Sequence, residues 1–90
     1  MHYIVAVRLT SGGTKTEHIS QVIWVNASSY ASGMSPTASM MDFVEKNPGT
    51  VRVTDGNTTA TVEVVNRSPK YLRSERDNSK TDNLLSITRF

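Results

Sequence analysis

One helical pattern among β-type segments constrains the fold of this chain more than any other feature. Residues 36–46 form the pattern, in which apolar residues recur at helical spacing: Met40, Phe43 and Val44. Ser35 is expected to be the N-cap, because a serine hydroxyl accepts an unpaired backbone N–H and a following proline suits the first helical position. A lone helix covers one face of a sheet, so the chain predicts an antiparallel β-sheet with the helix packed on one face.

Short runs rich in β-branched and aromatic residues predict the strands. Two runs precede the helix and three follow it: Tyr3–Leu9, His18–Val25, Thr50–Thr54, Thr58–Val65 and a short Lys70–Ser74. Residues 26–34 are small and polar and predict a loop, whereas Asp55-Gly56 predicts a tight hairpin. The expected fold class is therefore α+β, with four or five antiparallel strands in the chain order β-β-α-β-β and a C-terminal extension.

The length of 90 residues fits a single domain, residues 1–90. Residues 67–90 are basic and rich in turn-forming residues, and they make up the expected C-terminal extension. Three apolar side chains near its end follow a polar loop: Leu84, Leu85 and Ile87. We expect these side chains to pack the extension back onto the core.

Residue types that carry catalysis or bind metals are scarce in this sequence. The chain has no cysteine, which excludes disulfides, thiolate nucleophiles and cysteine-based zinc sites. Its histidines are His2, expected at a frayed N-terminus, and His18, expected at the surface or as a capping group. We therefore expect no catalytic residue, metal, cofactor or small-molecule substrate. No apolar run approaches the ~18 residues of a membrane span and no secretion signal is found, so a cytoplasmic location away from membranes is expected.

Positive charge is concentrated towards the C-terminal end. The net charge is only +2, but residues 1–66 carry four basic and five acidic residues, whereas residues 67–80 carry five basic and two acidic ones. Two interpretations stand side by side: a solvated, turn-rich segment, or an electrostatic surface for an acidic partner. The second makes nucleic-acid binding through Arg67–Lys80 an alternative function, with Tyr71 stacking on a base.

The candidate partner-binding residues are one loop aromatic and the basic segment. Tyr30 lies in the polar loop, where an aromatic ring is not easily buried, and we expect it to be an interaction anchor. The other candidates belong to the basic segment: Arg67, Lys70, Tyr71, Arg73 and Arg76. Trp24 and the methionines near the helix start are interpreted as core packing, with a docking surface as the alternative.

Several short motifs together carry a resemblance to a known family. They are IVAVR at Ile4–Arg8, HISQVIW at His18–Trp24, and YLR at Tyr71–Arg73 followed by Asp77 and by DNLL at Asp82–Leu85. The set resembles a family of small bacterial and phage-borne proteins known as a domain of unknown function. The resemblance implies a compact domain of prokaryotic or viral origin, and it implies no catalytic residue, cofactor or substrate. In a phage, it would imply a host or defence protein as partner and the host cytoplasm as location.

These observations favour a non-catalytic protein-binding module that associates with itself. A small sheet with one helix leaves strand edges exposed, and an exposed edge offers unpaired N–H and C=O groups to a second chain. Pairing of two such edges gives a symmetric dimer. The expected partner is thus a protein, including a second copy of the chain, with nucleic acid as the alternative.

Overall fold

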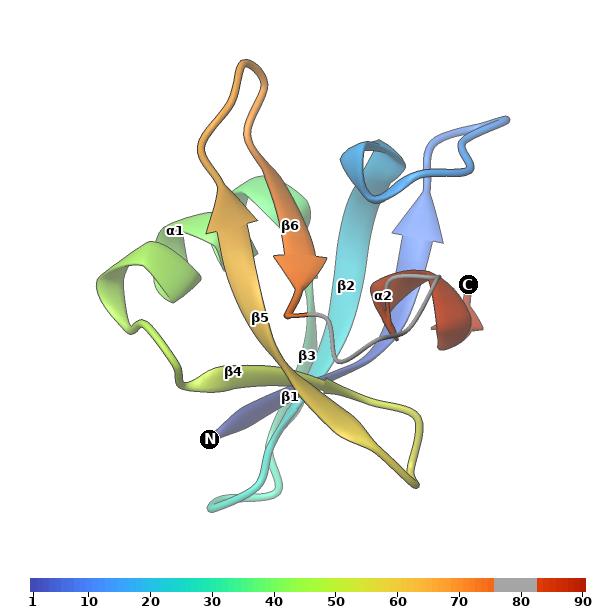
Figure 1. Ribbon diagram of the computed structural model, residues 1–90. Coiled ribbons are helices and arrows are strands. Elements are labelled where there is room, and N and C mark those ends of the chain that lie inside the picture. The colour runs from blue at the N-terminus through green and yellow to red at the C-terminus, as the bar shows by residue number, and fades with distance from the viewer. Residues whose placement is uncertain (76–82) are drawn as a thin grey trace.

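The computed structural model describes residues 1–75 and 83–90, which form an α+β domain around a twisted sheet (Figure 1). Its strands are β1 (His2–Leu9), β2 (Ile19–Asn26), β3 (Ser32–Pro36), β4 (Val51–Thr54), β5 (Thr59–Val65), β6 (Tyr71–Ser74) and β7 (Thr88–Arg89). Its helices are α1 (Thr37–Lys46), the short α2 (Asn83–Ser86) and a single 3-10 turn, η1 (Thr16–His18). The α+β class is confirmed, but there are more strands than expected, and α2 is a second helix where one was predicted.

The sheet is mixed, so the prediction of a purely antiparallel sheet is wrong. The strand order is β3-β2-β1-β4-β5-β6, and β7 also pairs with β1. The β1–β4 and β1–β7 pairs are parallel, whereas the other pairs are antiparallel. The reason lies in β3, which runs parallel to β1 because both pair antiparallel with β2. The chain then crosses over through α1, and such a connection returns the next strand in the same direction.

Strand β3 lies inside the segment that was expected to be a loop and a helix cap. It pairs with β2 from Val25↔Ser32 to Gln21↔Pro36. Ser35 belongs to this strand, so it is not the N-cap; the N-cap is Pro36, which makes no side-chain capping bond. The Ser35 hydroxyl instead accepts a hydrogen bond from the indole Nε1 of Trp24 at 3.0 Å.

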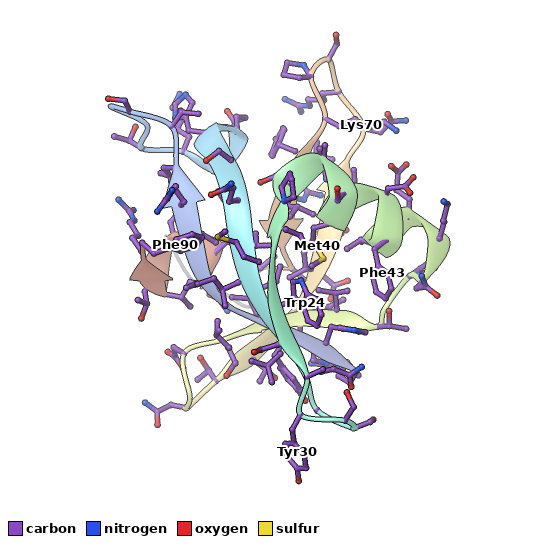
Figure 2. The ribbon with its side chains drawn as sticks, turned by 180° about the vertical axis from the view of Figure 1, so that it is seen from behind. Trp24, Tyr30, Met40, Phe43, Lys70 and Phe90 are labelled. Carbon is purple, nitrogen blue, oxygen red and sulfur yellow. The ribbon has the colours of Figure 1, made fainter. Side chains whose placement is uncertain are left out.

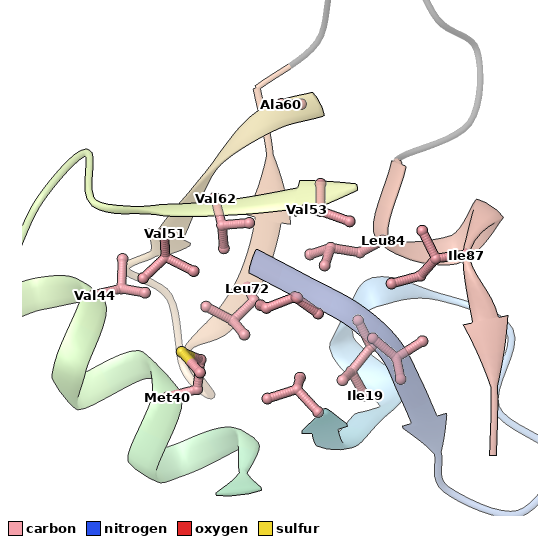
Figure 3. Packing of buried hydrophobic residues seen from close by; sticks show 13 residues of the cluster. Ile19, Met40, Val44, Val51, Val53, Ala60, Val62, Leu72, Leu84 and Ile87 are labelled. Carbon is pink, nitrogen blue, oxygen red and sulfur yellow. The ribbon is translucent and has the colours of Figure 1, made fainter. Parts of the chain in front are cut away.

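The core lies between the sheet and α1, with α2 closing one end (Figure 3). Its most deeply buried side chains come from five strands and α2: Ile4, Val7, Val22, Val51, Val53, Val62, Leu72 and Leu84. Helix α1 contributes Met40 and Val44, as its spacing predicted. Each such side chain contributes roughly 1.5–3 kcal/mol when fully buried, so the sheet strands supply most of the stabilisation.

A register shift in β1 explains how both halves of that strand reach the core. Ile4 pairs with Trp24, and the next paired residue is Ala6, so Val5 is skipped. Ile4 and Val7 are three positions apart and would face opposite sides of a regular strand, yet both are fully buried. The extra residue at Val5 therefore acts as a β-bulge that re-aims the strand.

The C-terminal residues fasten the end of the chain to β1. Leu84 is fully buried and Ile87 is 8% exposed, whereas Leu85 is half-buried. After these residues, β7 pairs with Ala6 and Val7, along the same edge of β1 to which β4 pairs nearer the N-terminus. The Arg8 guanidinium lies 4.8 Å from the centre of the Phe90 ring. Within the described part of the chain, no helix is long and apolar enough to cross a membrane.

Candidate binding surface

Two of the predicted basic residues, Lys70 and Arg73, form ion pairs. Lys70 Nζ lies 3.2 Å from a carboxylate oxygen of Glu45 on α1, and Arg73 Nε lies 2.6 Å from Glu63 on the neighbouring strand. Tyr71 is half-buried and Arg67 is exposed. Arg76 lies outside the described residues. The positive charge of this segment is thus partly balanced by carboxylates, although each such surface pair stabilises the fold by only about 0–1 kcal/mol.

Tyr30 lies at the opposite end of the molecule from Lys70, so the structure does not bring the predicted site residues together (Figure 2). Its side chain is 86% exposed, in the turn between β2 and β3. Hydrogen bonds close this turn: Tyr30 N–H donates to the Asn26 carbonyl at 2.8 Å, and Asn26 Oδ1 accepts the N–H of Ser28 at 2.9 Å. Tyr30 has a φ of +60°, which is uncommon for a residue with a side chain. The ring therefore projects from a closed turn.

A cavity of about 280 Å³ lies between α1, β3 and the N-terminal end of β1. Aromatic, small polar and apolar side chains line it: His2, Trp24, Ser35, Ser39, Met40 and Phe43. The His2 ring meets Trp24 edge-to-face at 5.4 Å and Phe43 at 4.9 Å between ring centres, a geometry that aromatic rings favour. We call this cavity the aromatic pocket.

The N-terminal strand is fixed where it forms the wall of the aromatic pocket. The His2 N–H donates to the Thr50 carbonyl at 3.0 Å, and the Met1 carbonyl accepts the Ala27 N–H at 3.0 Å. The expectation that His2 sits at a frayed terminus is therefore wrong. Backbone pairing holds the His2 ring between its two aromatic neighbours.

Gly33 determines where the Trp24 indole lies. The two residues face each other across β2 and β3, and a Cβ placed on Gly33 would lie 2.6 Å from Cζ2 of Trp24. Only a glycine lets the ring lie against β3 at this distance, and the bond to Ser35 fixes its rotation. Trp24 packs partly against the core and also lines the aromatic pocket, so both interpretations of this residue hold in part.

Strand β3 forms one edge of the sheet, beside the aromatic pocket. Among the described residues it pairs only with β2, on one side. Its sequence, SGMSP, has no charged residue, and Met34 at its centre is 58% exposed. Natural edge strands are usually protected by charges, and β6, the last strand at the other end, carries the Arg73–Glu63 ion pair. The β3 edge lacks that protection.

Two polar groups outside this surface have structural roles. His18 Nδ1 accepts the backbone N–H groups of Thr14 and Lys15 at 3.0 and 3.1 Å, which confirms the predicted capping role. Asp55 accepts the N–H groups of Thr58 and Asn57, and these bonds lower the pKa of its carboxyl below the ordinary value of 3.8. In residues 1–75 and 83–90, no group of three or more potential ligand side chains is placed to hold a metal ion.

The sequence alone did not reveal the aromatic pocket as a site. Its lining residues come from four separate segments, and one of these, β3, was not predicted as a strand. The available signal was Trp24 in a strand, followed by a glycine nine residues later. That signal has meaning only when the two residues are known to face each other.

Comparison with known proteins bears on the family rather than on the site. The chain matches a family model described as "Protein of unknown function (DUF3892)" over residues 3–87. No curated protein and no solved structure matches it. The matched range contains every motif on which the resemblance rested. Because the match covers nearly the whole length, the chain belongs to the DUF3892 family of proteins of unknown function.

Proposed function

We propose that this protein is a non-catalytic binding module that takes an extended segment of a protein partner along the free edge of β3. The observation that carries the proposal is the position of the aromatic pocket directly beside that edge, between β3 and α1 (Figure 2). In strand addition, backbone hydrogen bonds supply affinity and a neighbouring pocket selects a side chain. In this protein the free backbone edge of β3 and the aromatic pocket lie side by side.

The lining of the aromatic pocket favours an apolar or aromatic side chain. Trp24, Phe43 and Met40 present ring and thioether surface, and the Ser39 hydroxyl adds one polar group at an exposed position on α1. Among the described residues that line the pocket there is no carboxylate, so they offer a cationic side chain no counter-charge. A second copy of the chain is one such partner, because it carries an exposed aromatic residue of its own.

Selection of phage-displayed random peptides tests this function. We expect peptides with a recurrent apolar or aromatic position that bind the wild type. Ser39→Phe fills the pocket from an exposed site and should weaken their binding at least tenfold. Ala38→Phe is the matched control, since Ala38 is exposed on the same helix and does not line the pocket. Selection of no peptides, or equal binding by both variants, would overturn the proposal.

Nucleic-acid binding through Arg67–Lys80 is the alternative, and the excess of basic residues in that segment favours it. The ion pairs of Lys70 and Arg73 with glutamates reduce the charge available to phosphates, so this function has less support. Gel retardation of single- and double-stranded DNA and RNA at low salt tests it. Binding that weakens steeply with salt and is lost in Arg67→Glu would support it, and absence of retardation would remove it.

A further inference from the structure

We propose that a second copy of the chain occupies this surface in a two-fold dimer. In this dimer β3 pairs antiparallel with the partner's β3 about an axis at Met34, and each Tyr30 enters the aromatic pocket of the other copy. The inference rests on the proposed function and names the partner of the same surface. Three features of the described residues carry it.

The first feature is that the β3 edge suits pairing with itself. A two-fold axis places the central residue of the strand against its own copy, so a charged residue there would face a like charge. The residues of β3 are all uncharged, and the central one, Met34, is exposed and apolar. Two Met34 side chains would therefore meet across the axis without repulsion. At the other end of the sheet, β6 carries Arg73 and is followed by the exposed Glu75.

The second feature is the spacing between Tyr30 and the aromatic pocket. Tyr30 precedes the start of β3. The lining of the pocket extends along β3 from Trp24, which faces Gly33, to Ser35 and Ser39 beside its end. With the axis at Met34, the partner's Tyr30 lies four residues beyond the axis, which is at most about 13 Å at the rise of a strand because Tyr30 itself belongs to the turn before β3. That position is level with the first turn of α1, where Ser39 lines the pocket. The exposed ring is thus placed to reach the Ser39 end of the partner's pocket across one self-complementary edge.

The third feature is that an ordered turn holds Tyr30 in an exposed position before any partner binds. Its ring is 86% exposed and the turn that carries it is closed by hydrogen bonds to Asn26. An aromatic side chain with few rotatable bonds on an ordered turn loses little conformational entropy when it binds. Its ring fits the apolar lining of Trp24 and Phe43, and its hydroxyl end fits the pocket mouth, where Ser39 is exposed.

Sedimentation equilibrium and Trp24 fluorescence test the dimer. Trp24 is the only tryptophan and lines the pocket, so dilution of the wild type should dissociate the dimer and shift its emission in parallel. Tyr30→Asn keeps a residue that tolerates the left-handed turn, and it should raise the dimer dissociation constant at least tenfold. Ser28→Ala, in the same turn, should leave the constant unchanged.

Cross-linking tests the register, because the chain has no cysteine of its own. Facing residues of an antiparallel pair have Cα atoms about 4.5–5.5 Å apart, within the range of a disulfide. Met34→Cys should therefore form a covalent dimer under mild oxidation, and Ser28→Cys should not.

The outcomes separate this inference from the proposed function. A dimer that Tyr30→Asn does not weaken, or one that Met34→Cys does not cross-link, overturns the inference. A monomer at every concentration that still binds selected peptides through the aromatic pocket also overturns the inference, but it leaves the binding function standing. A monomer that selects no peptides overturns both.

Discussion

At the scale of single residues, Gly33 has the clearest role in the candidate site. Its missing side chain makes room for the Trp24 indole, which is the largest ring in the wall of the aromatic pocket. Cross-strand packing of an aromatic residue over a glycine is a known way to stabilise an edge strand. The position of β3 and the shape of the pocket therefore depend on the same contact.

Gly33→Ala should destabilise the protein by about 1–3 kcal/mol, because the new methyl group would overlap the Trp24 ring and force it or β3 to move. Urea unfolding followed by tryptophan fluorescence measures this loss, and the native emission should shift as well. Ser32→Ala, at an exposed position of the same strand, should change stability by less than about 0.5 kcal/mol. Equal stability of the two variants would contradict the role given to Gly33.

Asp55 makes the stability of the fold depend on pH, and the direction of that dependence follows from its lowered pKa. The backbone N–H groups of Thr58 and Asn57 stabilise the carboxylate in the folded state, so the folded pKa lies below the ordinary value of 3.8. Its contribution to stability is complete above that value and is lost as the pH falls through the lower, folded pKa. The stability advantage of the wild type over Asp55→Ala should therefore shrink as the pH is lowered from about 5 to 2. Thermal unfolding across this range measures it, and a constant difference would contradict the assignment.

At the scale of elements, local pattern predicted some strands well and failed at β3. The apolar runs at residues 3–9, 18–25, 50–54 and 58–65 all became strands, because β-branched residues favour the pleated surface. The sequence SGMSP carries no such residues, and its extended form depends on pairing with β2. Pairing partners are set by tertiary contacts, so neither β3 nor the parallel direction of β1 and β4 could be predicted locally.

Helix α2 is a short element in which Leu84 is the buried residue. Leu84 is fully buried against the core, whereas the adjacent Leu85 is only half-buried. Leu84→Ala should therefore lower the free energy of unfolding by about 2–5 kcal/mol, since it leaves a cavity in the core. Leu85→Ala removes the same atoms from a less buried site and should cost clearly less. Chemical denaturation of both variants provides the comparison, and a reversed order would contradict the packing described here.

At the scale of the whole molecule, the aromatic pocket and the basic segment are separate surfaces. The pocket lies beside the edge strand β3, while Lys70 and Arg73 pair with glutamates of α1 and β5. The sequence predicted Tyr30 as an exposed aromatic residue, and its exposure of 86% confirms that part. It could not predict the pocket, because His2, Trp24, Ser35 and Phe43 meet only in the folded chain.

The attachment of the C-terminal end is a second feature of the whole molecule, since β7 pairs the end of the chain with the central strand β1. Deletion of residues 88–90 removes the pairing with Ala6 and Val7 and the stacking of Arg8 on Phe90. We expect a loss of about 1–3 kcal/mol, measured by thermal or urea unfolding. Phe90→Ala keeps the strand pairing and should lose less. Unchanged stability of the deletion variant would show that the β7 pairing and the Arg8–Phe90 contact contribute nothing to the free energy of unfolding.

The bulge at Val5 has a consequence for how insertions and deletions act on this fold. The alternation of β1 side chains between the two faces of the sheet shifts by one residue at Val5, so the strand consists of two regular halves on either side of the bulge. Excising Val5 would leave Ile4 and Val7 two positions apart, the spacing at which residues of a regular strand share a face, so both side chains would still reach the core opposite Val22 and Trp24. A deletion at this position is thus one that the pattern of buried residues in β1 accommodates.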